Sequence, residues 1–143
     1  MAESFDKVTA KTKTNTIGGI IGYNYGKVER CVNNGGVRGF DKIGGIVGAV
    51  SSYNGEGDIA QCVNNGVVNV LQSTLLRGGV LGETSTNTKL EANYYDASVN
   101  VNGGAANNGV EGVTGLSSSE LVAGNALQGV STFVLICFGA NAT

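Results

Sequence analysis

Short apolar segments alternate with glycine and asparagine along the first two thirds of the chain, and the same segments recur. The segment Ile17-Gly-Gly-Ile-Ile-Gly22 returns as Ile43-Gly-Gly-Ile-Val-Gly48 and again as Arg77-Gly-Gly-Val-Leu-Gly82. Short β-branched runs bounded by Gly and Asn are typical of strands. None is followed by a helical pattern long enough for a βαβ unit, so the pattern predicts an all-β chain.

A second block follows each glycine block at a fixed period. Val28-Glu-Arg-Cys-Val-Asn-Asn-Gly35 returns as Ile59-Ala-Gln-Cys-Val-Asn-Asn-Gly66, with a weaker copy at Leu90-Glu-Ala-Asn-Tyr-Tyr-Asp96. The first residues of these blocks are spaced by 31 each time, whereas the gaps before them vary. Fixed apolar positions with variable gaps indicate strands joined by loops of different length.

Each copy contains three strand candidates: the glycine block, the V-x-x-C-V block, and a valine segment at residues 36–40 or 66–70. The Asn-Gly pair before the valine segment tolerates positive φ and makes a sharp corner. Three short strands with Gly/Asn corners and a long fixed period describe one coil of a β-solenoid. A hairpin meander has no reason to repeat a side chain at this period.

The predicted fold is therefore a β-solenoid (β-helix) of about three short coils with a partial cap. Residues 1–96 form the repeat domain, with coils near 8–35, 36–66 and 67–96, and residues 97–143 form a Gly/Asn-rich connection and the C-terminal cap. In the cap, Ser117-Ser-Ser-Glu120 is a capping box for a helix through Leu121 to about Leu127. Val130 to Phe138 predicts a buried strand. The predicted core consists of Ile20, Val28, Ile46, Ile59, Val80 and Leu90, with Cys31 and Cys62 between them.

Composition removes most catalytic chemistry. The 143-residue chain has no His, and its net charge of −2 provides no basic field for nucleic acid. Without His, neither a Ser–His nor a Cys–His nucleophile can be built from this chain. The carboxylates are scattered: Glu29 and Glu91 lie two periods apart, but Ala60 stands between them. We expect no enzyme activity, no cofactor, no metal and no nucleic-acid partner.

The cysteines and asparagines of the second block recur in register. Backbones of adjacent coils lie about 4.8 Å apart, which is within disulfide reach, but stacked side chains point the same way. We therefore predict a ladder of buried thiols at Cys31 and Cys62, ahead of a disulfide, a metal site or a reactive thiol. Cys137, in the apolar end segment, is predicted to be core.

Two amide ladders are predicted at the corner that follows. Stacked asparagines hydrogen-bond through their amides, and a carbonyl-lined cation site is the alternative. Hard cations prefer carboxylates, which favours the ladders. The residues are Asn33 with Asn64, and Asn34 with Asn65.

The five tyrosines are the candidate ligand contacts. Tyr23, Tyr25 and Tyr53 fall in the loops after the glycine blocks, and Tyr94 and Tyr95 fall in the third copy. Exposed tyrosines can stack on sugar rings or anchor an interface. The alternative is that their rings cover the ends of the core.

The blocks resemble the GLUG repeat. The matching residues are Gly18-Gly-Ile-Ile-Gly22 with Asn24-Tyr-Gly26, and Gly44-Gly-Ile-Val-Gly48 with Asn54-Gly55, each followed by the V/I-x-x-C step. The third copy has lost the Asn-x-Gly step and carries Asn93 in place of the cysteine. Asn93-Tyr-Tyr-Asp96 and the later Gly115-Leu-Ser-Ser-Ser-Glu120 are similar to the ending of such arrays, so the resemblance covers about residues 8–120. It implies a segment of a bacterial surface or secreted protein, as in immunoglobulin A peptidases and large adhesin-like proteins, outside any catalytic domain.

Three functions follow as hypotheses. The first is a non-catalytic structural repeat segment at the cell surface or in a secreted protein, acting as spacer or adhesive face. The second is a module that binds carbohydrate or a host or matrix protein through the tyrosines, and the third is a fragment of a polysaccharide-active β-helix enzyme. The chain shows no signal peptide and no membrane-spanning run, so a cytoplasmic location stays open. Exposed ends of a solenoid also predict self-association unless they are capped.

Overall fold

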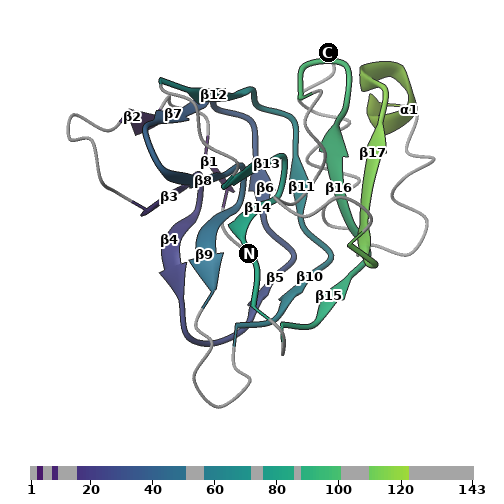
Figure 1. Ribbon diagram of the computed structural model, residues 1–143. Coiled ribbons are helices and arrows are strands. Elements are labelled where there is room, and N and C mark those ends of the chain that lie inside the picture. Colours follow the sequence, from purple (N-terminus) through teal and green to yellow (C-terminus); the bar gives the residue numbers. More distant parts are fainter. Residues whose placement is uncertain are drawn as a thin grey trace.

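The computed structural model describes residues 3–4, 8–9, 16–50, 57–71, 76–85, 88–100 and 110–122 (Figure 1). Over these ranges the chain consists mainly of short strands, and all the strand pairs are parallel. The predicted all-β class is therefore confirmed. The helix α1 (Ser118–Val122) is the single helix of the described ranges.

Each sheet gathers strands from successive repeats. In the first sheet Val28 lies beside Ile59, and Ile59 beside Leu90, which is the 31-residue period of the sequence. This sheet consists of β5 (Val28–Glu29), β10 (Ile59–Ala60) and β15 (Leu90–Glu91). The second sheet consists of β1 (Glu3–Ser4), β6 (Val32–Asn33), β11 (Val63–Asn64), β16 (Asn93–Asp96) and β17 (Val113–Leu116).

Three further sheets repeat this arrangement, with one strand from each repeat. In Figure 1 the strands β4 and β9 of the last of them run side by side at the left. One contains β2 (Val8–Thr9), β7 (Val37–Gly39) and β12 (Val68–Val70). The next contains β3 (Thr16–Gly18), β8 (Lys42–Gly44) and β13 (Arg77–Gly78). The last contains β4 (Ile21–Asn24), β9 (Val47–Val50) and β14 (Leu81–Glu83).

The number of strands per repeat corrects the sequence analysis. The prediction of three strands per copy is wrong, because both the glycine block and the V-x-x-C block bend in the middle and so give two strands each. In the V-x-x-C block the bend falls on Arg30, Gln61 and Ala92, with φ of 54°, 55° and 52°. A non-glycine residue in this left-handed region costs roughly 1–2 kcal/mol. The sequence places no Gly or Asn at this corner, so the corner could not be predicted from residue type.

The glycine block is bent so tightly that its backbone segments touch. A Cβ atom on Gly44 would lie 1.8 Å from the Val47 carbonyl oxygen, and one on Gly48 would lie 2.6 Å from the Gly22 carbonyl oxygen. Side chains at these positions would force the backbone apart. The glycines of the motif are therefore a packing requirement.

The core lies between the sheets and matches the prediction closely. Ile46, Ile59, Val80 and Cys62 are fully buried, and Val28 and Cys31 are nearly so. Ile20 and Leu90 are half-buried and pack against this cluster. Ile20 lies in the first of the three repeats and Leu90 in the last. Among the described residues, each of these repeats has a complete neighbouring repeat on one side only.

The predicted capping box is present at the start of α1. The Glu120 N–H donates to Ser117 Oγ at 3.2 Å, and the Ser117 N–H donates to Glu120 Oε1 at 3.2 Å. Leu121 on the first turn is buried. The helix begins at Ser118, but its predicted end, the predicted strand at 130–138 and Cys137 lie outside the described residues.

Candidate functional site

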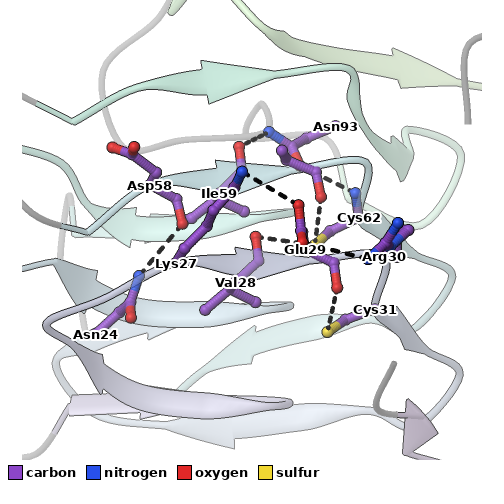
Figure 2. Close-up of polar contacts among 11 residues, drawn as sticks. Asn24, Lys27, Val28, Glu29, Arg30, Cys31, Asp58, Ile59, Cys62 and Asn93 are labelled. Atoms are coloured by element: carbon purple, nitrogen blue, oxygen red, sulfur yellow. Dashed lines mark hydrogen bonds and ion pairs between the residues drawn. The ribbon is translucent and has the colours of Figure 1, made fainter.

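The two described cysteines line one row of the interior (Figure 2). Both are buried thiols outside any disulfide. Cys31 Sγ donates to the Glu29 carbonyl at 3.4 Å, and Cys62 Sγ donates to the Ala60 carbonyl at 3.3 Å. The hydrogen bond to Cys31 and then burial raise the pKa of the Cys62 thiol far above its ordinary value. Cys62 is therefore held as a neutral thiol, the form that neither attacks nor ligates a metal.

Asn93 continues the row in the third repeat. Its Nδ2 donates to the Ile59 carbonyl at 2.8 Å, and its Oδ1 accepts from the Cys62 N–H at 3.1 Å. One repeat earlier, Cys62 Sγ points to the Val28 carbonyl in the same way, at 3.9 Å (Figure 2). The row therefore supplies a donor to the carbonyl of the preceding repeat.

Asn33 and Asn64 lie in the next row and are fully buried. Asn33 Nδ2 donates to Asn64 Oδ1 at 2.9 Å and to the Gly45 carbonyl at 2.9 Å. Asn64 Nδ2 donates to the Gly79 carbonyl at 2.7 Å. These amides form hydrogen bonds with backbone carbonyls in the interior, as buried polar groups generally do. Their partners in these contacts are other groups of the protein.

Asn34 and Asn65 are joined in a second row, where Asn65 Nδ2 donates to Asn34 Oδ1 at 2.7 Å. The third repeat places Asp96 at this position. Burial of the Asp96 carboxyl opposes its ionisation, but hydrogen bonds from Ser118 and Ser98 outweigh burial and hold its pKa below the ordinary value. The Asp96 carboxylate thus ties the end of β16 to the start of α1.

Tyr23 and Tyr25 form the most exposed aromatic feature of the described residues. Their exposed fractions are 44% and 65%, and their ring centroids lie 5.0 Å apart with an interplanar angle of 47°. Buried Asn24 fixes the turn between them, since its Oδ1 accepts from the Gly26 N–H at 3.0 Å. Its Nδ2 donates to the Gly26 carbonyl at 2.9 Å. The two rings are therefore presented by an ordered turn.

The other tyrosines are placed differently. Tyr94 and Tyr95 are half-buried in β16, and the Tyr95 ring packs on Gly79, where a Cβ atom would lie 2.5 Å from it. Burial raises the pKa of Tyr95. Tyr53 lies outside the described residues. Tyr23 was predicted in a loop but lies in β4, because the glycine block bends before Ile21 and the strand then resumes.

The charged groups of the described residues are distributed rather than clustered. Lys42 Nζ lies 2.8 Å from Glu83 Oε2, and this contact raises the pKa of Lys42. Glu29 pairs with Lys27 and Arg30, each at 3.3 Å. Within the described ranges no three His, Cys, Asp or Glu side chains come together as a metal site would require.

Comparison with known proteins adds no relative to this picture. No protein-family model, curated protein or solved structure matches the chain. No helix in the described part of the chain is long and apolar enough to cross a membrane.

Proposed function

We propose that the chain is a β-solenoid segment of GLUG-repeat type, with a non-catalytic structural role as spacer or adhesive face of a bacterial cell-surface or secreted protein. The observation that supports it is the pairing of equivalent residues: Val28, Ile59 and Leu90 lie side by side in one parallel sheet. Repeats that contact only their neighbours build length in one direction. A spacer needs that property and no reactive group.

The use of the buried polar side chains supports the same role. Three buried asparagines donate their side-chain N–H groups to backbone carbonyls of their own or neighbouring repeats; they are Asn33, Asn64 and Asn93. The two thiols donate to carbonyls as well. The first two repeats therefore stack uniformly, since the contacts of Asn33 with Gly35 and Gly45 are made again by Asn64 with Gly66 and Gly79.

Insertion of one repeat tests this proposal. A second copy of residues 36–66 placed after Gly66 adds 31 residues and keeps the register. The variant should melt at or above the wild-type temperature, and its longest dimension in small-angle X-ray scattering should grow by about 4.8 Å per added repeat.

The matched control is a half-repeat insertion, a copy of residues 36–50 at the same place, which breaks the register. It should lower the melting temperature. If the full repeat destabilises the protein as much as the half repeat, the spacer proposal is wrong.

A second role, recognition of carbohydrate or of a host or matrix protein, is favoured by the exposed Tyr23–Tyr25 pair. Rigid aromatic rings supply contact area at little entropic cost. The wild type and a Tyr23→Ala/Tyr25→Ala variant would be compared on arrays of glycans and matrix proteins, with Val67→Ala as a control at another exposed apolar residue. A hit lost only in the tyrosine variant supports the role, and binding that survives the double change excludes it in this form.

A further inference from the structure

The sheet that contains β12 ends in an unusual way. Between the first two repeats, the Val37 N–H donates to the Val67 backbone carbonyl at 2.8 Å. One repeat later, the equivalent N–H, that of Val68, donates to the side-chain oxygen of Asn100 at 2.8 Å. Among the strands that the structure describes, β12 is the last of this sheet. A side chain thus occupies the place of the next strand.

Asn100 reproduces both halves of the pattern by which a strand pairs. Its Oδ1 accepts from Val68, and its Nδ2 donates to the Gly66 carbonyl at 2.8 Å. A carboxamide offers the same donor and acceptor as a peptide group. Asn100 is 5% exposed, and its own N–H donates to the Asp96 carbonyl at 3.1 Å. The amide is therefore held in place as a substitute for a peptide.

Two other sheets end on something other than a further repeat. Gly112, with φ of +87°, lies so close to β15 that a Cβ atom would be 1.9 Å from the Leu90 carbonyl oxygen. The Gly112 carbonyl also accepts from the Asn93 N–H at 2.9 Å. Beside β16 runs β17, paired over four residues. The turn at 110–112 therefore lies against the Leu90 carbonyl of β15, and β17 covers β16.

Asp96 binds these parts together. Its carboxylate accepts from the Ser98 N–H at 2.9 Å and from the hydroxyls of Ser98 and Ser118. The turn that carries Asn100 is thereby connected to α1, whose Leu121 is buried. We use the name C-terminal cap for residues 96–100 and 110–122.

We propose that the C-terminal cap closes β12 and β16 against the addition of another strand, and that Asn100 is its edge-blocking residue at β12. Unpaired strand edges are templates for pairing with a second chain. The partner excluded by the cap is therefore a second copy of this chain. This inference stands apart from the proposed function, since it concerns only how the array ends.

The test compares Asn100→Ala with Asn69→Ala. Asn69 is an exposed asparagine on β12, the strand whose edge Asn100 contacts. The control therefore removes a carboxamide beside the Val68 amide without removing the hydrogen bond to it. Amide hydrogen exchange should become about tenfold faster at Val68 in Asn100→Ala, as expected for the loss of one net hydrogen bond. Exchange at Val37 should not change, and the control should leave both amides at the wild-type rate. In sedimentation velocity, Asn100→Ala should self-associate with rising concentration, while the wild type and the control stay monomeric.

Equal exchange at Val68 in Asn100→Ala and the wild type would overturn the proposal, as would a wild type that self-associates as readily as the variant. If Asn100→Ala does not fold, a measurement on the wild type alone tests the proposal. A through-hydrogen-bond scalar coupling between the Val68 amide nitrogen and Asn100 Cγ is expected. Its absence in spectra that show the Val37–Val67 coupling would overturn the proposal.

Discussion

The second and third repeats pair in register along the second block, but different side chains pack at the equivalent positions. The corner residue before each row keeps its left-handed backbone, with φ of 55° at Gln61 and 52° at Ala92. What changes is the chemistry of the side chains that follow it. The substituted pairs are Gln61 and Ala92, Cys62 and Asn93, Val63 and Tyr94, Asn64 and Tyr95, and Asn65 and Asp96.

The comparison shows which property each position needs. Cys62 and Asn93 both direct a donor at a carbonyl of the preceding repeat, although the thiol contact is 3.9 Å long and the amide contact 2.8 Å. Asn64 and Tyr95 both pack on the second glycine of a glycine block, Asn64 on Gly45 and Tyr95 on Gly79. Position and direction are kept while residue type varies, because the backbone beneath is the same.

The largest effect is expected at the glycine under each of these side chains. A Cβ atom on Gly45 would lie 2.0 Å from Asn64 Nδ2 and 2.1 Å from the Gly79 carbonyl. Gly45→Ala should therefore lower the free energy of unfolding by about 3 kcal/mol. Gly79→Ala should cost less, since the three atoms nearest to its Cβ position all belong to the Tyr95 side chain, whereas a Cβ on Gly45 also meets a backbone carbonyl. Urea denaturation measures both.

Gly26→Ala is the control for this pair, because nothing lies within 4 Å of its Cβ position. It should change stability by less than about 0.5 kcal/mol. A Gly79 variant as damaged as the Gly45 variant would show that Tyr95 is as rigidly held as Asn64.

The second prediction concerns the donor row. Asn93→Ala leaves the Ile59 carbonyl and the Cys62 N–H without their buried partner and should cost about 2–3 kcal/mol. Asn93→Cys restores the residue type of the other repeats and a weak donor, so it should recover about 1 kcal/mol of that loss. Equal losses in the two variants, measured by urea denaturation, would refute the equivalence of Cys62 and Asn93.

A smaller, pH-dependent effect is expected at Asp96. Because its folded pKa lies below the ordinary value of 3.8, the ionised carboxylate favours the folded chain. That contribution is complete above the ordinary pKa and is lost as pH falls through the lower folded pKa. Thermal melts of the wild type and Asp96→Asn over this range should show a smaller pH dependence in the variant. Parallel pH profiles would show that the Asp96 carboxylate does not stabilise the contact between β16 and α1.

The smallest effect is a gain in stability at the left-handed corner. Ala92→Gly removes the steric cost of positive φ and should stabilise the protein by about 0.5 kcal/mol after the entropy of glycine is subtracted. Ala60→Gly, the same change in strand β10, should destabilise by about 0.5–1 kcal/mol. Thermal or urea unfolding of both variants checks the sign, and a loss in both would argue against a left-handed Ala92.

Much of the architecture could be predicted from the periodicity. The residues predicted to stack at the start of the second block, Val28, Ile59 and Leu90, are paired in register. The predicted neighbours Asn33 and Asn64 are hydrogen-bonded. Periodicity is informative here because parallel pairing places residues one period apart side by side. The candidate ligand surface was less accessible to prediction, since the exposure of Tyr25 and the burial of Asn24 depend on how the Asn24 side chain bonds to Gly26 within one turn.

The sequence alone determined the period, the parallel rows and the glycine blocks, because each follows from local patterns that recur. Only the tertiary structure decided the five strands of each repeat, the corner at Arg30, Gln61 and Ala92, and the role of Asn100. The corner carries no glycine, so its conformation is imposed by the stacking on either side. Asn100 bonds to an amide 32 residues away, and a contact made once across that distance leaves no periodic signal.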